Sequence, residues 1–145
     1  MSKASRKRLE VEIADADYQA LVEFRYALRR FLAFSENAAK RARLTAQQYQ
    51  AMMIIKGFPS GERITIGELA RWLLIRHHTA VELVDRLARL GLAARVPDKT
   101  DRRRVLVALT AKGERKLKGL ASAHLYELRR VGVALPEVLK RLGMG

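Results

Sequence analysis

Arginine is the residue type whose clustering most clearly indicates a binding function in this sequence. Arg102, Arg103 and Arg104 follow one another within residues 97–104, a segment that lies between two short apolar runs. Each guanidinium is permanently charged and carries a planar set of donors, which suits it to phosphate and carboxylate groups. We therefore take this segment as a candidate contact with an anionic partner.

The whole chain carries the same imbalance of charge. Its 145 residues include 29 Lys and Arg against 15 Asp and Glu, so the formal net charge is +14. An excess of this size favours a nucleic acid or an acidic membrane surface as partner, and charge alone does not distinguish the two. Positive charge is concentrated from Arg71 to Arg104, where nine basic residues accompany four acids.

Catalytic and metal-binding patterns are missing from the sequence. Cysteine is absent, which excludes disulfides, thiolate nucleophiles and cysteine zinc sites. The three histidines, His77, His78 and His124, form no HExxH pattern, and the adjacent His77 and His78 cannot share one helical face. No GxSxG motif and no glycine-rich phosphate loop occurs. We expect a protein that is not an enzyme and holds no cofactor or metal ion.

The length and composition fit a single folded domain. A chain of 145 residues can bury roughly two thirds of its unfolded surface, and 49% of these residues are hydrophobic. Residues 1–14 form a basic arm with no apolar run behind it, and no segment has the ~18 consecutive apolar residues of a membrane span. We therefore expect a soluble, cytoplasmic protein with no membrane partner.

Hydrophobic periodicity predicts a long helix over residues 15–37. Its apolar side chains form two adjoining stripes, which together present more apolar surface than one internal contact covers. We expect the excess to be buried against a second copy of the chain. The stripes consist of Tyr18, Leu21, Val22, Leu28 and Leu32, and of Phe24, Ala27, Phe31 and Phe34.

Capping boxes mark two further helices. Residues 45–48 and 65–68 each place a threonine three positions before Gln or Glu, the spacing that satisfies free N–H groups at a helix start. The first helix should run to about Lys56. The second should carry on its inner face Leu69, Trp72 and Leu73. Another helix follows the interruption at residues 75–78 and ends at Gly91.

Beyond Gly91 the pattern changes from helical to extended. Residues 92–96 and 105–109 predict a two-stranded hairpin whose loop holds the three arginines. Thr110 caps a helix that continues to Gly132, and Pro136 opens a last short helix. The expected fold is mainly α with a small β-hairpin (α+β). A helix, turn, helix and arginine-tipped hairpin form a winged helix-turn-helix, whose second helix suits the DNA major groove.

Four motifs carry a resemblance to a known family. They are the capped LTxxQ helix start, the ELA helix, the VDRLxxxGL helix end and the hairpin pattern DxRxxxVxLTxKG. Together they resemble the MarR family of bacterial and archaeal transcription regulators, over roughly residues 16–142. The resemblance implies a homodimer with interlocked helices 15–37 and 111–142, and a DNA-binding lobe over residues 45–110. It also implies a pseudo-palindromic operator in double-stranded DNA and release by a small aromatic or anionic effector.

The first turns of the helix after residue 76 are the expected DNA readers. We assign base edges to His77, His78, Thr79 and Glu82, and a phosphate contact to Arg76. Glu82 departs from the family, which often has Arg, Lys or Gln there. It could accept from cytosine N4 or adenine N6, or it could point to solvent.

The hairpin loop is the second expected contact. Arg102, Arg103 and Arg104 should bind DNA, and Arg103, which matches the wing arginine of the family, should be the tip in a narrow minor groove. The carboxylate of Asp101 repels phosphate, so we expect its role to lie within the protein. It should hold the Arg103 side chain in position, or pair with Arg86 and fix the angle of the wing. The alternative is a solvated loop acid.

An effector pocket is a further expectation, and ordinary core packing is its alternative. Its candidate lining residues are Phe31, Tyr49, Met52 and Met53. Arg25 and Arg43 lie nearby in sequence and favour an aromatic carboxylate or a phenol. We expect His124 to be packed or hydrogen-bonded at the dimer contact.

The sequence is compatible with two functions. One is a ligand-responsive repressor that reads an inverted repeat as a homodimer. The other is an architectural protein that binds DNA without sequence preference, for which the charge of +14 would suffice. An RNA-binding module is less favoured, because no aromatic pair alternates with basic residues.

Overall fold

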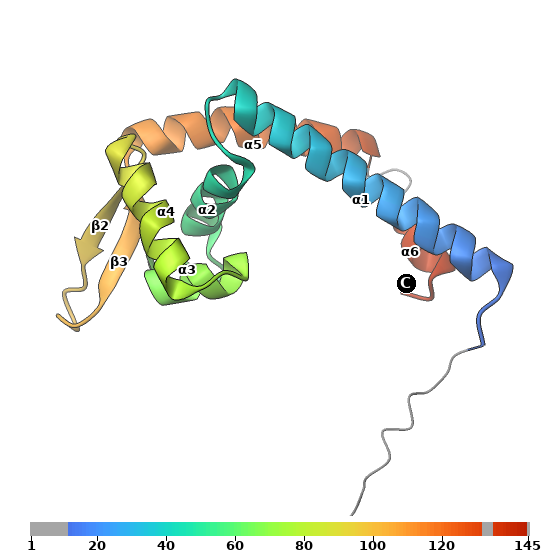
Figure 1. Ribbon diagram of the computed structural model, residues 1–145, viewed down its shortest axis with the longest axis horizontal. Coiled ribbons are helices and arrows are strands. Elements are labelled where there is room, and N and C mark those ends of the chain that lie inside the picture. The colour runs from blue at the N-terminus through green and yellow to red at the C-terminus, as the bar shows by residue number, and fades with distance from the viewer. Residues whose placement is uncertain (1–11, 132–134, 145) are drawn as a thin grey trace, which may run out of the picture.

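A winged lobe and a long helical arm make up the computed structural model, which describes residues 12–131 and 135–144 (Figure 1). The helices are α1 (Asp15–Arg41), α2 (Ala46–Gly57), α3 (Ile66–Leu73), α4 (His77–Arg89), α5 (Ala111–Val131) and α6 (Leu135–Arg141). The strands are β1 (Ile64–Thr65), β2 (Ala93–Pro97) and β3 (Val105–Leu109). The expected mainly helical fold with a winged helix-turn-helix is confirmed. Residues 1–11 of the expected basic arm, and Gly132, lie outside the described residues.

The sheet has one strand more than the sequence predicted. It is antiparallel, in the order β1-β3-β2, with Ile64 and Arg95 both opposite Val107. The prediction of a two-stranded hairpin was therefore incomplete. A strand of two residues shows no alternation of polar and apolar side chains, so no periodic pattern could reveal β1.

Threonine caps fix the helix starts. The backbone N–H of Gln48 donates to Thr45 Oγ1 at 3.0 Å, and that of Glu68 donates to Thr65 Oγ1 at 3.2 Å. Thr110 Oγ1 accepts from the N–H of Gly113 at 3.0 Å and donates to the carbonyl of Gly91, two residues after α4, at 2.6 Å. This last threonine thus joins the start of α5 to the end of α4.

The core of the lobe is built from all its elements and the first half of α5. Its largest fully buried side chains are Tyr49, Met52, Ile64, Leu69, Val84, Leu87, Leu92 and Val107. Trp72 is not among them: it is 52% exposed, so the prediction that it faces inward was wrong. The inner face of the short α3 is filled by Leu69 and Ala70, and the Trp72 ring packs edge-on against Phe58 at the rim, with ring centroids 5.9 Å apart.

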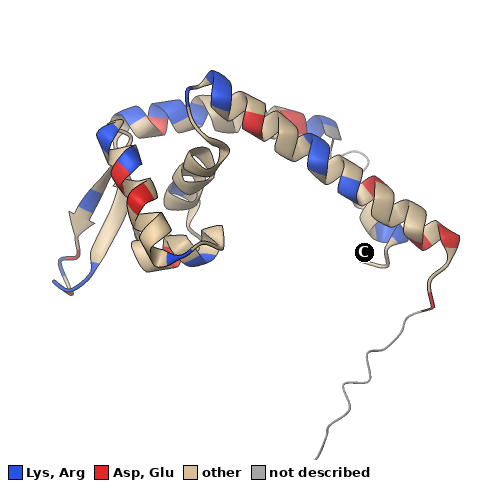
Figure 2. Ribbon diagram, viewed as in Figure 1, with Lys and Arg blue, Asp and Glu red and all other residues tan. Residues whose placement is uncertain are grey.

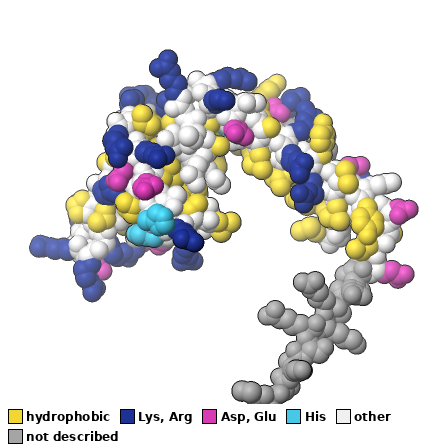
Figure 3. All heavy atoms as spheres, viewed as in Figure 1, with side chains coloured by type: hydrophobic (Ala, Val, Ile, Leu, Met, Phe, Trp, Pro, Cys, Tyr) yellow, Lys and Arg dark blue, Asp and Glu magenta, His cyan; other side chains and the backbone are white. Residues whose placement is uncertain are grey.

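The arm consists of α1, the second half of α5, and α6. Helix α1 runs past the predicted end at Asn37 to Arg41, because Ala38 and Ala39 continue the helix and Ala39 is fully buried. It packs along α5 and α6 (Figure 1), and an ion pair joins Glu23 to Arg141. Many large apolar side chains of the arm stay exposed, as Figure 3 shows. On α1 and α5 they are Tyr18, Leu21, Val22, Tyr26, Leu28, Leu32, Leu125, Tyr126 and Leu128.

Candidate nucleic-acid interface and adjoining cavity

Helix α4 packs one face against the lobe core and exposes the other face to solvent. The residues that it buries in the core are Ala80, Leu83, Val84 and Leu87. At its start Arg76, His77, His78 and Glu82 are exposed and Thr79 is half-buried. The N-cap residue, Arg76, has extended backbone and makes no side-chain cap. A guanidinium carries donors alone and cannot cap the N–H groups at the start of the helix, so Arg76 stays available to donate to another partner.

The turn before α4 sets the direction of that helix. Leu74 ends α3 in the left-handed conformation, with φ 56°, and its side chain is fully exposed to solvent. The N–H groups of Leu74 and Ile75 donate to the carbonyls of Arg71 and Ala70 at 3.2 and 3.0 Å. This tight turn brings the start of α4 to the side of the lobe that lies away from α5 (Figure 1).

Asp101 and Arg103 organise the tip of the wing. The carboxylate oxygen Oδ1 of Asp101 accepts from the backbone N–H of Arg103 at 3.0 Å and from its Nε at 3.2 Å. The Arg103 side chain is nevertheless 91% exposed. Of the two pairings considered for Asp101, the structure has the one with Arg103. Within the described ranges no ion pair joins Asp101 to Arg86.

Asp98 holds the other side of the loop. Its Oδ1 accepts from the backbone N–H of Thr100 at 2.9 Å and from its hydroxyl at 2.8 Å, and Arg104 Nε lies 3.9 Å from Oδ2. The hydrogen bonds from Thr100, and then the charge of Arg104, hold the pKa of Asp98 below its ordinary value. Both loop acids are thus engaged within the wing, where Arg102, Arg103 and Arg104 are exposed.

An ion pair that the sequence did not reveal links the wing to α4. Arg95 on β2 lies 2.6 Å from Asp85 on α4. The two residues are ten positions apart and face each other only because the chain reverses at Gly91, which has φ 71°. The connection between wing and helix that we expected from Asp101 and Arg86 is therefore made by Asp85 and Arg95.

The two expected contact regions lie on one side of the lobe. The start of α4 and the loop between β2 and β3 both point away from α5 (Figure 1). Figure 2 shows basic residues at this loop and also along α5, so positive charge extends beyond the expected interface. Histidine side chains are visible at the surface of the lobe, beside acidic ones (Figure 3).

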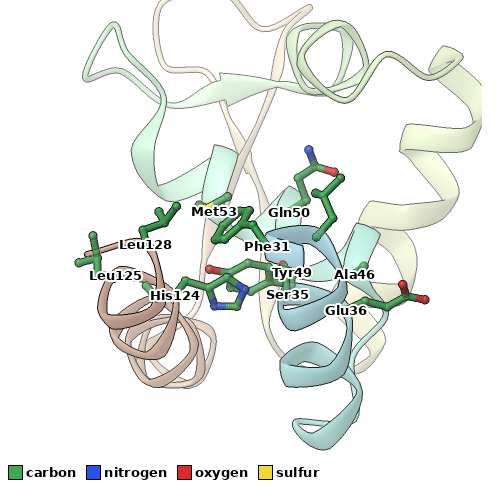
Figure 4. A pocket seen from close by; sticks show the side chains of 12 residues that line it. Phe31, Ser35, Glu36, Ala46, Tyr49, Gln50, Met53, His124, Leu125 and Leu128 are labelled. Carbon is green, nitrogen blue, oxygen red and sulfur yellow. The ribbon is translucent and has the colours of Figure 1, made fainter. Parts of the chain in front are cut away.

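A cavity of about 620 Å³ lies where the arm meets the lobe, between α1, α2 and α5 (Figure 4). Phe31, Tyr49 and Met53 line it, as the sequence suggested. Met52 does not: its side chain is fully buried in the core, so its assignment to the pocket was wrong. Met53, in contrast, is 44% exposed and lines the cavity.

His124 is one of the lining residues that the sequence did not assign to the pocket. Its ring stacks on Tyr49 with centroids 4.4 Å apart (Figure 4), and it meets Phe31 and Phe34 edge-on. Nδ1 lies 2.6 Å from the carbonyl oxygen of Leu120. His124 is therefore packed and hydrogen-bonded as expected, but within one chain.

The polar groups of the cavity are few. Among the described residues, Tyr49 Oη and His124 Nε2 are the buried side-chain atoms with no hydrogen-bond partner. Burial raises the pKa of Tyr49, so its hydroxyl keeps its proton at neutral pH. Glu36 is the one charged side chain in the described lining, and neither Arg25 nor Arg43 takes part in it.

Other kinds of site find no support in the described residues. No three His, Asp or Glu side chains there are grouped so that they could hold a metal ion. None of the helices in that part of the chain has the length and hydrophobicity needed to cross a membrane.

Comparisons with known proteins relate the lobe to one family. The model of the MarR family matches residues 44–104, from the start of α2 to the end of the wing loop. The transcriptional activatory protein BadR of Rhodopseudomonas palustris is 33% identical over 78 residues. The match covers 54% of this chain and 45% of BadR, so it spans less than half of that relative.

Solved structures share the fold over most of the chain. AbsC, a MarR family transcriptional regulator from Streptomyces coelicolor, has a TM-score of 0.71 and 22% identity, over 91% of this chain and 90% of its own. A MepR mutant from Staphylococcus aureus bound to an oligodeoxyribonucleotide has a TM-score of 0.64 and 21% identity, over 85% and 84%. The similarity thus includes the arm as well as the lobe.

Proposed function

The chain belongs to the MarR family of DNA-binding transcription regulators, and from this premise we propose that it reads a preferred sequence in double-stranded DNA as a homodimer. The observation that carries the proposal is the common side on which the start of α4 and the arginine loop lie (Figure 1). Members of this family are regulators and not enzymes, in agreement with the missing catalytic motifs. We place the protein in the cytoplasm, where such a partner is found.

The DNA contacts divide into base reading and positioning. His77, His78, Thr79 and Glu82 are proposed to meet base edges in the major groove, where a well-made contact discriminates by roughly 1–3 kcal/mol. For Glu82 this means accepting from cytosine N4 or adenine N6. Arg76 binds phosphate. The loop arginines enter the adjoining minor groove, with Arg103 foremost.

The homodimer is supported by the exposed apolar surface of the arm. Soluble monomers rarely leave so many large apolar side chains uncovered on two adjacent helices. A second copy packed on α1 and α5 would cover them. Two-fold symmetry then sets the two α4 helices about 34 Å apart, or a multiple of it, and requires an inverted-repeat operator.

Ligand-controlled repression is the regulatory part of the proposal. The cavity between α1, α2 and α5 touches both the arm and the lobe, so a ligand there can favour one angle between them. A ligand that weakens operator binding 100-fold needs ~2.7 kcal/mol of coupling. We propose that a small aromatic effector releases the protein from its operator in this way.

Selection of duplexes from a random pool tests the function. A regulator should enrich one inverted repeat and prefer it over random duplex by ~10³ or more. An architectural protein would enrich none, and its affinity would depend on salt alone. Glu82→Ala should weaken binding to the selected duplex and leave random DNA unaffected. Equal losses on both would remove Glu82 from the base readers.

A further inference from the structure

Positive charge on the lobe is not confined to the side that carries the start of α4 and the wing loop. A second group of cations comes from the end of α4 and the first half of α5, and Figure 2 shows basic residues along this part of α5. The start of α4 and the wing loop point away from α5, so the two groups lie on opposite sides of the lobe (Figure 1). We call the second group the α5 basic surface. It consists of Arg89, Lys112, Arg115, Lys116 and Lys118, which are exposed except for the half-buried Lys116.

The end of α4 and the start of α5 are held together at this surface. Lys112 Nζ donates to the carbonyl oxygen of Leu90 at 3.1 Å, and Leu90 directly follows Arg89, the last residue of α4. Arg89 therefore lies beside the first turn of α5. In the described part of the chain, none of the five cations of the α5 basic surface takes part in an ion pair. Their charge is available to an external partner.

The acid that accompanies these cations is already paired elsewhere. Glu114 is the one acidic residue of residues 111–121, and Lys56 Nζ lies 2.8 Å from its carboxylate. Both side chains border a hollow beside α5 that is also lined by Arg115 and Lys118. The acid thus neutralises a cation of α2 and leaves the α5 basic surface uncompensated.

The spacing of the cations is unfavourable for an isolated helix. Lys112 and Lys116 are four residues apart, and Arg115 and Lys118 are three apart. Like charges at these spacings lie on neighbouring turns of one helix face and destabilise the helix. A partner with closely spaced negative charges would offset this repulsion.

The surroundings of the cations favour DNA over an acidic protein or a membrane. The large apolar side chains of residues 111–121 are Leu117 and Leu120, and both are buried. A protein partner needs apolar or aromatic anchors, and a membrane-bound helix needs an exposed apolar face. A DNA interface is polar and positive, and its affinity comes from Lys and Arg on phosphates. Lys112 and Lys118 are separated by roughly 9 Å of helix rise, over which one DNA strand carries about two to three phosphates.

We propose that the α5 basic surface binds a second DNA duplex through its phosphates, without sequence preference, so that the protein holds two duplexes at once. The proposal goes beyond the proposed function and rests on it only for the first duplex, which is read through α4 and the wing. One short duplex does not reach both surfaces, because they lie on opposite sides of the lobe and DNA has a persistence length of ~150 base pairs.

A capture assay on the full chain tests the proposal. The duplex selected from a random pool is immobilised and loaded with protein, and a fluorescent duplex of random sequence is then added at low salt. Both duplexes are kept far shorter than the persistence length of ~150 base pairs, so that neither can fold back onto the other surface. We expect the loaded protein to retain the fluorescent duplex, and the bare immobilised DNA to retain none.

Two variants of equal net charge locate the second contact. Arg115→Gln/Lys118→Gln removes two exposed cations of the α5 basic surface and keeps residues of similar helix propensity. It should lower the affinity for the fluorescent duplex at least about tenfold. Arg129→Gln/Lys140→Gln removes two exposed cations of the arm and should retain the fluorescent duplex as the parent protein does. Both variants should bind the immobilised duplex equally well.

A parent protein that retains no fluorescent duplex would overturn the proposal, as would equal losses in the two variants, which would make net charge the cause. Poly-glutamate that displaces the fluorescent duplex better than unlabelled DNA of equal charge would assign the surface to an acidic protein and also overturn it. The outcome is separable from that of the proposed function. A protein that selects no duplex, yet joins two random duplexes through the α5 basic surface, contradicts sequence reading alone. One that selects a duplex and retains no second one contradicts only this surface.

Discussion

The winged lobe and the helical arm differ in how far one chain completes their burial. In the lobe, side chains from α2, α3, α4, the sheet and the start of α5 form one continuous core. In the arm, the helices α1, α5 and α6 bury few side chains and leave a row of leucines and aromatics in solvent (Figure 3). The lobe therefore has a complete core within one chain, whereas the arm has an uncovered apolar surface, which the proposed homodimer would bury. Changes in the arm should alter assembly, and changes in the lobe should alter DNA binding.

Negative charge introduced on the exposed apolar surface of α1 should have the largest effect, on both assembly and operator binding. Leu21 and Leu28 lie on one side of α1 and are both about half exposed, so a second copy would cover four leucines in all. That burial stabilises the dimer by roughly 3–5 kcal/mol, so Leu21→Glu/Leu28→Glu should raise the dimer dissociation constant more than ~100-fold. Sedimentation should then find a folded monomer with weak operator binding.

Gln47→Glu is the control, because it adds a negative charge at an exposed position of α2 in the lobe, outside the apolar surface of the arm. This variant should remain a dimer. A parent protein that is already a well-folded monomer at micromolar concentration would show that the arm needs no second copy.

The packing of the start of α5 against the rest of the lobe should come next. A Cβ atom on Gly113 would lie 2.0 Å from the carbonyl oxygen of Leu92, so Gly113→Ala forces α5 away from β2. We expect a loss of roughly 1–3 kcal/mol in the free energy of unfolding, measured by denaturant titration. Gly119→Ala has open space in the same helix and should gain about 0.5–1 kcal/mol. Equal effects of the two substitutions would contradict the close approach at Gly113.

Removing the wing tip should weaken DNA binding without changing assembly. Arg103→Ala deletes a loop cation that is 91% exposed and should lower operator affinity about tenfold, with a salt slope smaller by about 1. Arg129→Ala removes the same charge from an exposed position on the arm and should change neither value. Similar losses in both variants would mean that net charge, and not the wing, sets the affinity.

The smallest effect should come from Asp101. Exposed ion pairs contribute roughly 0.2–1 kcal/mol, so Asp101→Ala should weaken operator binding only two- to threefold. The direction of the change in operator affinity is informative, because the substitution removes a negative charge and simple electrostatics would therefore strengthen DNA binding. Asp15→Ala, which removes an acid from the arm, serves as control. Tighter binding by Asp101→Ala, measured by fluorescence anisotropy, would contradict the positioning of Arg103.

The sequence predicted the features that depend on local patterns. The capping threonines Thr45, Thr65 and Thr110 begin α2, α3 and α5, because a cap needs only residues three positions apart. The wing strands were marked by an extended apolar pattern on either side of the arginines. The interruption expected at residues 75–78 marked the break between α3 and α4, although α4 already begins within it, at His77.

Features that depend on how elements meet could not be read from the sequence. The ion pair of Asp85 with Arg95 exists because β2 folds back along α4. Met52 and Met53 are neighbours in sequence, and the packing of α2 alone decides that Met52 enters the core and Met53 the cavity. His124 joins the cavity because α5 crosses α1 and α2, and periodicity marked it only as one more position on an apolar helix.

The central claim, that the chain reads sequence through α4 and the wing as a dimer, is tested most directly by one competition. The duplex selected from a random pool is compared with two others of equal length and composition, one with a single half-site scrambled and one with both scrambled. Fluorescence anisotropy at fixed salt should show affinity for the doubly scrambled duplex lower by ~10³ or more, with the singly scrambled duplex between the two. Affinities within about threefold of one another for all three duplexes would contradict sequence reading and leave only charge-driven binding.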